Sequence, residues 1–224
     1  MPAAARNLFK FVEHLSVNDS ARLLLMLAEA RRQAAHAEGD FIEMGVFRGG
    51  SALLLAYALK EQGSPHRLHL LDSWEGMPPP QPEDAGAIVG EGGFADSSEE
   101  MVRDALDEVG LLDRCTTYQG WFEQTLPALQ GPFGLAHVDC DFYEPMKFCL
   151  QHLLTRMTPQ GTIVIDDFGN GGTSNFPGVS RAVHEVVYGT PWRVVPLGGA
   201  RDESVLLLRT GQASTAAAEQ IMLL

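Results

Sequence analysis

Basic residues are scarce in this chain of 224 residues. It contains 16 Lys and Arg against 29 Asp and Glu, which gives a formal net charge of −13. The one adjacent basic pair, Arg31 and Arg32, stands alone. Binding to phosphate groups requires clustered Lys and Arg. We therefore expect no nucleic-acid partner and no anionic membrane surface as a partner.

Cysteine and long apolar runs are rare as well. The three cysteines, Cys115, Cys140 and Cys149, are odd in number and lack metal-binding spacing, which argues against a disulfide framework. No apolar run approaches the roughly 18 residues of a membrane-spanning helix. The first ten residues, M-P-A-A-A-R-N-L-F-K, show no secretory pattern. A cytoplasmic protein with one large core fits this composition best.

A phosphate-binding loop and a dinucleotide fingerprint are both absent, yet a glycine-rich turn follows the first predicted strand. That strand ends at Glu43, and the turn leads through Gly45 into a helix predicted over Ser51–Gln62. Glycines there let the backbone approach a ligand closely. A second predicted strand ends at Asp72, where a carboxylate is placed to accept hydrogen bonds from ribose hydroxyls. Without a phosphate-binding pattern, these features favour S-adenosylmethionine over NAD.

Acidic pairs end two further predicted strands. Asp139 and Asp141 follow the apolar run 133–138, and Asp166 and Asp167 follow the run 162–165. Between them, 145–157 has a helical period, and Pro159 to Gly161 supply stop and turn residues. Ligands bind at the carboxyl ends of parallel strands. Carboxylates gathered there favour a hard divalent cation such as Mg²⁺ or Ca²⁺; the simpler alternative is that they cap turns and helices.

Strands and helices alternate along the chain, which predicts an α/β fold. We expect a Rossmann-like sheet of about seven mostly parallel strands, with helices on both faces and an antiparallel pair at 192–197 and 204–208. Residues 1–38 are predicted as a helical segment that caps the sheet or makes an oligomer contact. The main domain is expected over 39–211, with an irregular lid over 74–98 rich in Pro and Gly. The tail 212–224 has no assigned role.

Five motifs, in order and at matching intervals, resemble the macrocin O-methyltransferase family, whose members methylate sugar hydroxyls of macrolide antibiotics. They are E-M-G-V-F-R-G-G-S, L-D-S-W-E-G-M-P, G-W-F-E-Q-T-L-P, V-D-C-D-F-Y-E-P and I-V-I-D-D-F, and the likeness covers about residues 40–190. The resemblance implies a class I methyltransferase fold, S-adenosylmethionine as methyl donor and a divalent metal, usually Mg²⁺.

By the same resemblance, the metal ligands, and hence the catalytic residues acting through the metal, are Asp139, Asp166 and Asp167. The candidate cofactor-binding residues, from the resemblance and from the strand-end pattern, are Glu43, Met44, Gly45, Val46, Gly49, Ser51, Asp72, Ser73, Gly120 and Trp121. A small hydroxylated acceptor is implied, a vicinal diol or sugar of a natural product, together with a homo-oligomer, most simply a dimer.

The proton acceptor is not identified. The sugar methyltransferases of the family have a lid histidine as general base, whereas residues 73–136 contain none. The candidates are Asp96, Asp141 or metal-bound water, while His137, His152 and His184 fall at positions expected to be structural.

Two alternatives remain open. A catechol-type O-methyltransferase shares strand-end Asp ligands, but its catalytic Lys would fall at Phe142. A protein of the same fold that binds S-adenosylmethionine without methylating would explain the missing lid histidine.

Overall fold

The computed structural model describes residues 3–36, 38–169, 174–198 and 203–210. The strands are β1 (Asp40–Met44), β2 (Leu68–Asp72), β3 (Cys115–Gln119), β4 (Phe133–Val138), β5 (Met157–Phe168), β6 (Trp192–Gly198) and β7 (Glu203–Arg209). The helices are α1 (Ala3–Val12), α2 (Ser20–His36), α3 (Gly50–Glu61), α4 (Glu99–Glu108), α5 (Phe122–Thr125), α6 (Tyr143–Leu153) and α7 (Pro177–Val187), with 3-10 turns η1 (Pro82–Asp84), η2 (Leu112–Arg114) and η3 (Leu126–Ala128).

All seven strands form one sheet in the order β3-β2-β1-β4-β5-β7-β6. Neighbours from β3 to β5 pair in parallel, and β7 lies antiparallel between β5 and β6. The predicted fold class is therefore confirmed, including the antiparallel pair at the end. The predicted C-terminal tail, 212–224, lies outside the described residues.

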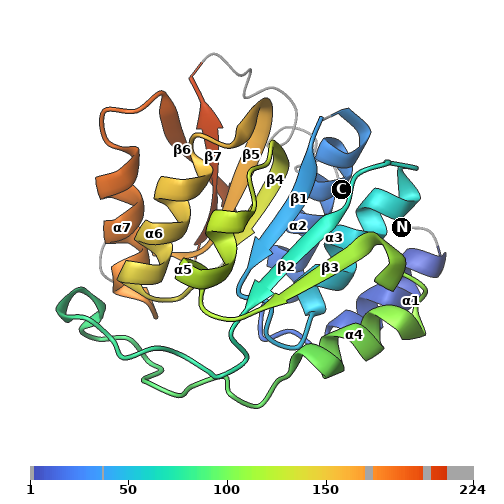
Figure 1. Ribbon diagram of the computed structural model, residues 1–224, viewed down its shortest axis with the longest axis horizontal. Helices are drawn as coiled ribbons and strands as arrows, with labels where there is room; N and C mark the ends of the chain where they lie inside the picture. The colour runs from blue at the N-terminus through green and yellow to red at the C-terminus, as the bar shows by residue number, and fades with distance from the viewer. Residues whose placement is uncertain (1–2, 37, 170–173, 199–202, 211–224) are drawn as a thin grey trace.

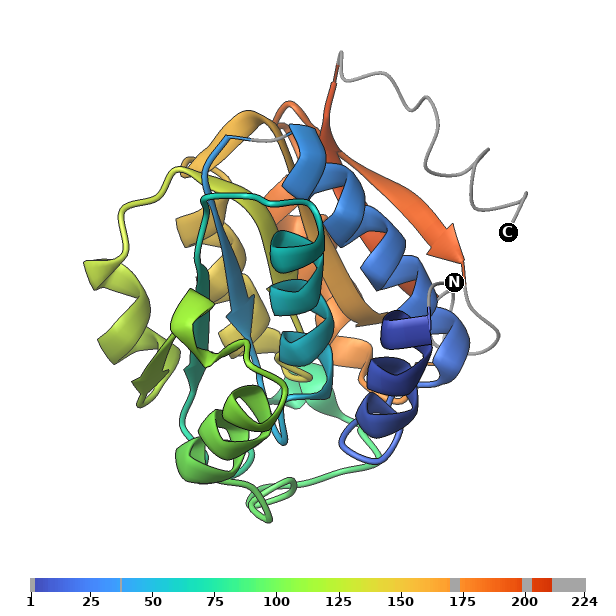
Figure 2. The same ribbon diagram turned by 90° about the vertical axis from the view of Figure 1, so that its right-hand side faces the viewer.

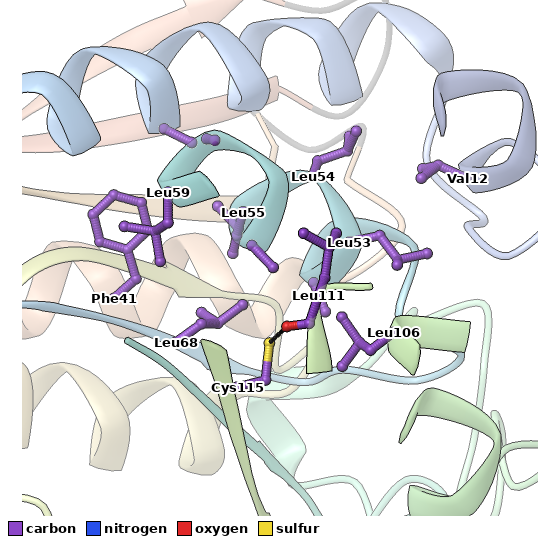
Figure 3. Close-up of a cluster of buried hydrophobic side chains, with 14 of the residues drawn as sticks. Val12, Phe41, Leu53, Leu54, Leu55, Leu59, Leu68, Leu106, Leu111 and Cys115 are labelled. Atoms are coloured by element: carbon purple, nitrogen blue, oxygen red, sulfur yellow. Dashed lines mark hydrogen bonds between the residues drawn. The ribbon is translucent and has the colours of Figure 1, made fainter. Parts of the chain in front are cut away.

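Alternate side chains of the inner strands enter two different cores, as the two-residue period of a strand requires. Phe41 and Leu135 pack with α1, α2, α3 and α4, whereas Ile42 and Ala136 pack with α6 and α7. Figures 1 and 2 show the two groups of helices on opposite sides of the sheet. Figure 3 shows the first core, where α3 leucines meet Phe41, Leu68 and Val12. Both faces of the sheet are thus buried, which explains the nearly unbroken apolar strand sequences.

The N-terminal helices pack on the molecule's own core. α2 lies against α3 and over the sheet, and a buried polar contact fixes it there: Gln33 Nε2 donates to Thr162 Oγ1 at 3.0 Å, and that hydroxyl donates to Glu29 Oε1 at 2.6 Å. Only a satisfied buried polar network of this kind is stabilising. The oligomer contact predicted for this segment stays a prediction.

Strand β5 is longer than the sequence pattern predicts. Pro159, Gln160 and Gly161, predicted as a turn, lie within it, in a stretch where the register with β4 shifts. Asp166 and Asp167 are therefore its tenth and eleventh residues rather than residues that follow it. The bulge explains the error, because it places turn-type residues inside a ladder without ending the strand.

No helix in the described parts of the chain is long and apolar enough to cross a membrane.

Candidate active site

The carboxyl ends of β1, β2 and β4 are joined by backbone hydrogen bonds. The N–H of Gly45 donates to Leu71 O at 3.1 Å, and the N–H of Asp139 donates to Met44 O at 2.9 Å. On the outer side, Gly120 N donates to Asp72 O at 2.9 Å. Because β1 is central, the turn that follows it lies between the predicted ribose carboxylate and the predicted metal carboxylates.

Gly45 is required by this close approach. Its φ is +85°, and a Cβ at this position would lie 1.8 Å from the carbonyl oxygen of Asp139. Only glycine combines that backbone conformation with no side chain. The glycine predicted from the turn pattern therefore brings β1 and β4 together at the site, in addition to leaving room for a ligand.

Asp72 organises the glycine turn. Its Oδ2 accepts hydrogen bonds from the backbone N–H groups of Val46 at 2.8 Å and Phe47 at 2.9 Å. Its Oδ1 accepts from Trp74 N at 2.8 Å. Each carboxylate oxygen has two lone pairs, so Oδ1 keeps capacity for one further donor such as a ribose hydroxyl. The position predicted from the strand-end pattern thus also holds the loop in shape.

A cavity of about 510 Å³ lies at this edge, within the usual range for small-molecule sites. Seven of the predicted site residues line it: Gly45, Asp72, Ser73, Gly120, Trp121, Asp139 and Asp167. The cavity continues from the glycine turn to the acidic strand ends, and residues of the segment predicted as a lid also line it. Figure 1 shows this segment leaving β2 at the same edge of the sheet. The sequence patterns that predicted a cofactor and a cation therefore converge on one site.

Six other predicted residues are not among those that line the cavity: Glu43, Met44, Val46, Gly49, Ser51 and Asp166. Met44 and Val46 are core side chains on opposite faces of the sheet. Gly49 takes a left-handed conformation at the start of α3, and Ser51 is buried in that helix. These residues therefore belong to the core and to the start of α3, next to the turn, rather than to the cavity lining.

Glu43 and His137 form a buried pair beneath the cavity. Glu43 Oε1 lies 2.8 Å from His137 Nδ1, and both side chains are almost fully buried. Burial alone would lower the pKa of His137, but the hydrogen bond and charge of Glu43, with the charges of Asp139 and Asp166, raise it to about 9. Glu43 Oε2 is buried and has no hydrogen-bond partner among the described residues.

The acidic residues meet as the strand-end pattern predicts, but in a different grouping. Carboxylate oxygens of Asp139, Asp141 and Asp167 lie within 4.8 Å of one another, and Asp166 shares such a group with Asp139 and His137. Burial, followed by the charges of the neighbouring carboxylates, raises the pKa of Asp139 and Asp141 well above the ordinary value. The same causes raise the pKa of Asp167 to about 6, against the opposing effect of Arg22. Mutual repulsion of this kind is what a bound cation relieves.

The N-terminal segment supplies residues to this site that the sequence patterns missed. The guanidinium of Arg22 lies 2.5 Å from Asp166 Oδ1 and 2.9 Å from Asp167 Oδ1. Asn18 Nδ2 donates to Asp166 Oδ2 at 2.8 Å, and Ser204 Oγ donates to its Oδ1 at 2.7 Å. In the sequence, Arg22 looks like Arg31, which instead pairs with Glu61 on the surface. Only tertiary packing distinguishes the two arginines.

The lid closes the cavity with apolar side chains. Met77, Val89 and Phe94 from the lid line the cavity and pack on the same core cluster as Phe122, Phe142 and Phe176. Ile88 also lines the cavity, although it is 67% exposed. Asp96, a candidate proton acceptor, does not line the cavity; it is exposed and pairs with Arg48. Asp141, the other candidate carboxylate, does line it.

The two other histidines expected to be structural, His152 and His184, make structural contacts. His152 is hydrogen-bonded to the carbonyl of Leu129, and His184 packs edge-on against Phe168.

Backbone strain is concentrated around the cavity. Five described residues other than glycine have a positive φ: Phe47, Trp74, Phe94, Asp141 and Asp167. All of these except Trp74 line the cavity. Such conformations cost about 1–3 kcal/mol each and persist where the surrounding structure imposes them, often at functional sites.

Comparison with known proteins places this arrangement in a family. The family model described as Macrocin-O-methyltransferase (TylF) matches residues 20–187. The chain is 35% identical over 139 residues to the 8-demethyl-8-(2,3-dimethoxy-alpha-L-rhamnosyl)-tetracenomycin-C 4'-O-methyltransferase of Streptomyces olivaceus, covering 58% of this chain and 53% of that protein. It is 30% identical over 159 residues to the mycinamicin III 3''-O-methyltransferase of Micromonospora griseorubida, covering 66% and 59%. The chain thus matches just over half the length of these curated relatives.

Solved structures show the same fold. The calicheamicin methyltransferase CalS11 superimposes with a TM-score of 0.72 at 22% identity, over 93% of this chain and 92% of that chain. The O-methyltransferase TomG from Streptomyces achromogenes, in complex with SAM, superimposes with a TM-score of 0.61 at 20% identity, over 94% and 91%. The family match over 20–187, together with this fold and the strand-end site, shows that the chain belongs to the macrocin O-methyltransferase (TylF) family.

Proposed function

We propose that this protein transfers the methyl group of S-adenosylmethionine to a hydroxyl group of a natural product, with a vicinal diol or sugar as the acceptor. The observation that carries this proposal is the cavity in which the glycine turn with Asp72 meets the carboxylates Asp139, Asp141 and Asp167. Membership of the family and the names of its relatives, which are O-methyltransferases, support the reaction class.

The cofactor half of the cavity fits S-adenosylmethionine. Gly45 and Gly120 present backbone without side chains, Asp72 keeps a free lone pair on Oδ1, and Trp121 offers an aromatic surface for the adenine. None of the described residues that line this half is basic, which suits a cofactor that carries no phosphate.

The acidic half fits a divalent cation. Oxygen-only ligands suit Mg²⁺, and three carboxylates this close together, with Asp167 buried and the other two half-buried, repel one another until their charge is neutralised. Asp139 and Asp167 are proposed ligands, and the geometry favours Asp141 as the third, because Asp166 is already engaged by Arg22, Asn18 and Ser204. A cation held there supplies a Lewis acid that lowers the pKa of an acceptor hydroxyl.

The chain's own residues orient the acceptor and exclude water. The lid and the aromatic residues opposite it form an apolar wall that keeps the acceptor hydroxyl beside Asp139 and Asp141. With Asp96 outside the cavity, Asp141 is the candidate carboxylate that lines it; one of its oxygens would bind the cation and the other would accept the hydroxyl proton. Methyl transfer then forms the bond from oxygen to the methyl carbon as the bond from that carbon to sulfur breaks.

Charge restricts the acceptor class. Of the described residues lining the cavity, Arg22 is the only basic one, and both Asp166 and Asp167 already hold it. A phosphate group would thus find no unpaired basic side chain among these lining residues. An uncharged acceptor with an apolar body fits the lining better.

The catechol-type alternative has less support. Its catalytic Lys would fall at Phe142, and Phe142 is buried and lines the cavity. Lys147, on the next turn of α6, instead contacts Tyr143 and Glu185 near the surface.

Calorimetric titration with S-adenosylmethionine, with and without Mg²⁺, tests the proposal at its first step, and absence of cofactor binding would overturn it. The second step measures methyl transfer to methyl α-L-rhamnoside and to catechol, with Mg²⁺ or with EDTA. We expect transfer to the rhamnoside only with Mg²⁺, and a loss of about 100-fold or more in Asp139→Asn. Asp107→Asn, an exposed change on α4, is the control. Transfer to catechol alone would establish the alternative, and binding without transfer to either probe would favour a non-methylating protein.

A further inference from the structure

The lid, closed on itself at its neck, contacts the rest of the molecule at two places, one partly exposed and one buried. Its neck is closed by hydrogen bonds from Met77 N to Gly93 O at 2.8 Å and from Gly92 N to Met77 O at 2.9 Å. On the cofactor side, Phe94 packs edge-on against Phe47 at 5.4 Å, and Asp96 pairs with Arg48 at an exposed position. The second attachment is buried and depends on Asp84.

Asp84 lies in the 3-10 turn of the lid and is only 3% exposed. Its Oδ2 accepts from Gln81 N within the lid, and its Oδ1 accepts from Tyr143 N at 2.8 Å. Tyr143 is the first residue of α6, so this N–H has no partner within its own helix. A carboxylate at a helix N-terminus is also favoured by the helix dipole.

The start of α7 completes the docking site. A Cβ on Gly178 would lie 1.9 Å from Asp84 Oδ1 and 2.9 Å from Tyr143 N. The absence of a side chain at Gly178 therefore makes room for the carboxylate. Nearby, Ile88 N of the lid donates to Asn175 O at 3.1 Å, just before α7. The lid thus rests on the first turns of the two helices that follow the acidic strand ends.

We propose that Asp84 is a positioning residue that docks the lid on α6 and α7 and so forms the acceptor wall of the cavity. Met77, Val89 and Phe94 of the lid line the cavity with Phe142 and Phe176 and pack on the same core cluster, so loss of this contact would remove them from the wall. Tyr143 lies two residues after Asp141, so docking also fixes the lid relative to the acidic cluster. The effect on the reaction rests on the proposed function, but the docking itself is measurable without it.

Hydrogen exchange followed by mass spectrometry, on the full chain, tests the docking. In Asp84→Ala we expect peptides covering 77–94 and the start of α6 to exchange at least about tenfold faster, since a buried hydrogen bond to a charged group is lost. Gly178→Ala is an independent probe, because it leaves Asp84 intact and displaces it sterically, and it should have the same effect. The matched control is Asp96→Ala, which removes an exposed ion pair of the same lid and should change exchange by less than about twofold.

Kinetics with methyl α-L-rhamnoside separate positioning from mere folding support. We expect the KM for the rhamnoside to rise about tenfold in Asp84→Ala, with affinity for S-adenosylmethionine within about twofold of the unmodified protein. Unchanged lid exchange in both variants would overturn the proposal, as would faster exchange spread evenly over all peptides. Faster lid exchange with an unchanged KM would overturn the positioning role. If the unmodified protein transfers no methyl group, the proposed function fails, and the exchange data alone decide the docking.

Discussion

Glu43 and His137 form a buried contact between neighbouring strands, with Glu43 Oε1 2.8 Å from His137 Nδ1. Glu43 ends the first strand and was expected at the cofactor; it contacts the histidine two residues before Asp139 instead. A strand-end position is visible in a sequence, but the partner across a parallel pair is not, because it depends on the register of β1 with β4, where Glu43 pairs with His137.

This pair predicts a fall in stability at alkaline pH. Because the pKa of His137 is raised from 6.5 to about 9, its contribution is complete below pH 6.5 and is lost as the pH rises through 9. We expect the Tm of the unmodified protein to fall between pH 7 and 9.5. Glu43→Gln should cost roughly 3–5 kcal/mol at pH 6.5 and give a flatter profile. Thermal unfolding against pH measures this, with Glu108→Gln, an exposed change, as control; parallel profiles for Glu43→Gln and the unmodified protein would contradict it.

The carboxylates predict a ranking of cation affinity. Asp141 faces Asp139 and Asp167, whereas Asp166 is held by Arg22, Asn18 and Ser204. We expect Asp141→Asn to weaken Mn²⁺ binding, measured by electron paramagnetic resonance, at least as much as Asp166→Asn does, by about tenfold or more. A loss confined to Asp166→Asn would restore the ligand set implied by the family resemblance.

At the scale of elements, the turn after β1 connects the two halves of the site. Gly45 lies where β1 meets the end of β4, and Gly63 has a similar positive φ after α3 with no atom near its missing side chain. The two glycines form a matched pair, because both substitutions strain the backbone and only one also introduces a clash.

Gly63→Ala should therefore cost about 1 kcal/mol of unfolding free energy, and Gly45→Ala clearly more than about 3 kcal/mol, together with loss of S-adenosylmethionine binding. Urea unfolding and calorimetry measure the two effects. Equal costs for both variants would show that the contact with Asp139 is unimportant.

Elements were easier to predict than their ends. The helix predicted over Ser51–Gln62 corresponds to α3 (Gly50–Glu61), a run rich in Ala and Leu whose side chains are mostly buried. The end of α6 and the length of β5 were misjudged, since Pro159 to Gly161 look like a turn but lie within the strand. A bulge is set by pairing with a neighbouring strand, which no local pattern contains.

At the scale of the whole molecule, the cavity gathers negative charge from two strand ends on a protein that is already acidic, with a net charge of −13. Because the pKa of Asp167 is raised from 3.8 to about 6, the folded protein favours the protonated form of this carboxyl. In the metal-free protein the resulting stability is complete below pH 3.8 and is lost as the pH rises through 6. A cation that binds the ionised carboxylates reverses this loss.

The rise in Tm on adding Mg²⁺ should therefore grow between pH 5 and pH 7.5. Differential scanning calorimetry measures it, with NaCl at equal ionic strength as the control for screening. Asp139→Asn should reduce the increment. An increment that NaCl reproduces, or that does not vary with pH, would show that no specific cation site exists here.

The sequence by itself determined the fold class, which strands end in acidic residues, and the edge of the sheet at which those residues lie. Apolar periods define the helices and strands, and parallel strands must present their carboxyl ends together, so Asp72, Asp139 and Asp167 were expected at one place. Tertiary structure alone decided the rest: Arg22 beside Asp166, Glu43 beside His137, and Asp84 at the first turns of α6 and α7. These contacts join residues from 59 to 144 positions apart, and nothing local in a chain specifies which distant side chains will meet once its elements have packed.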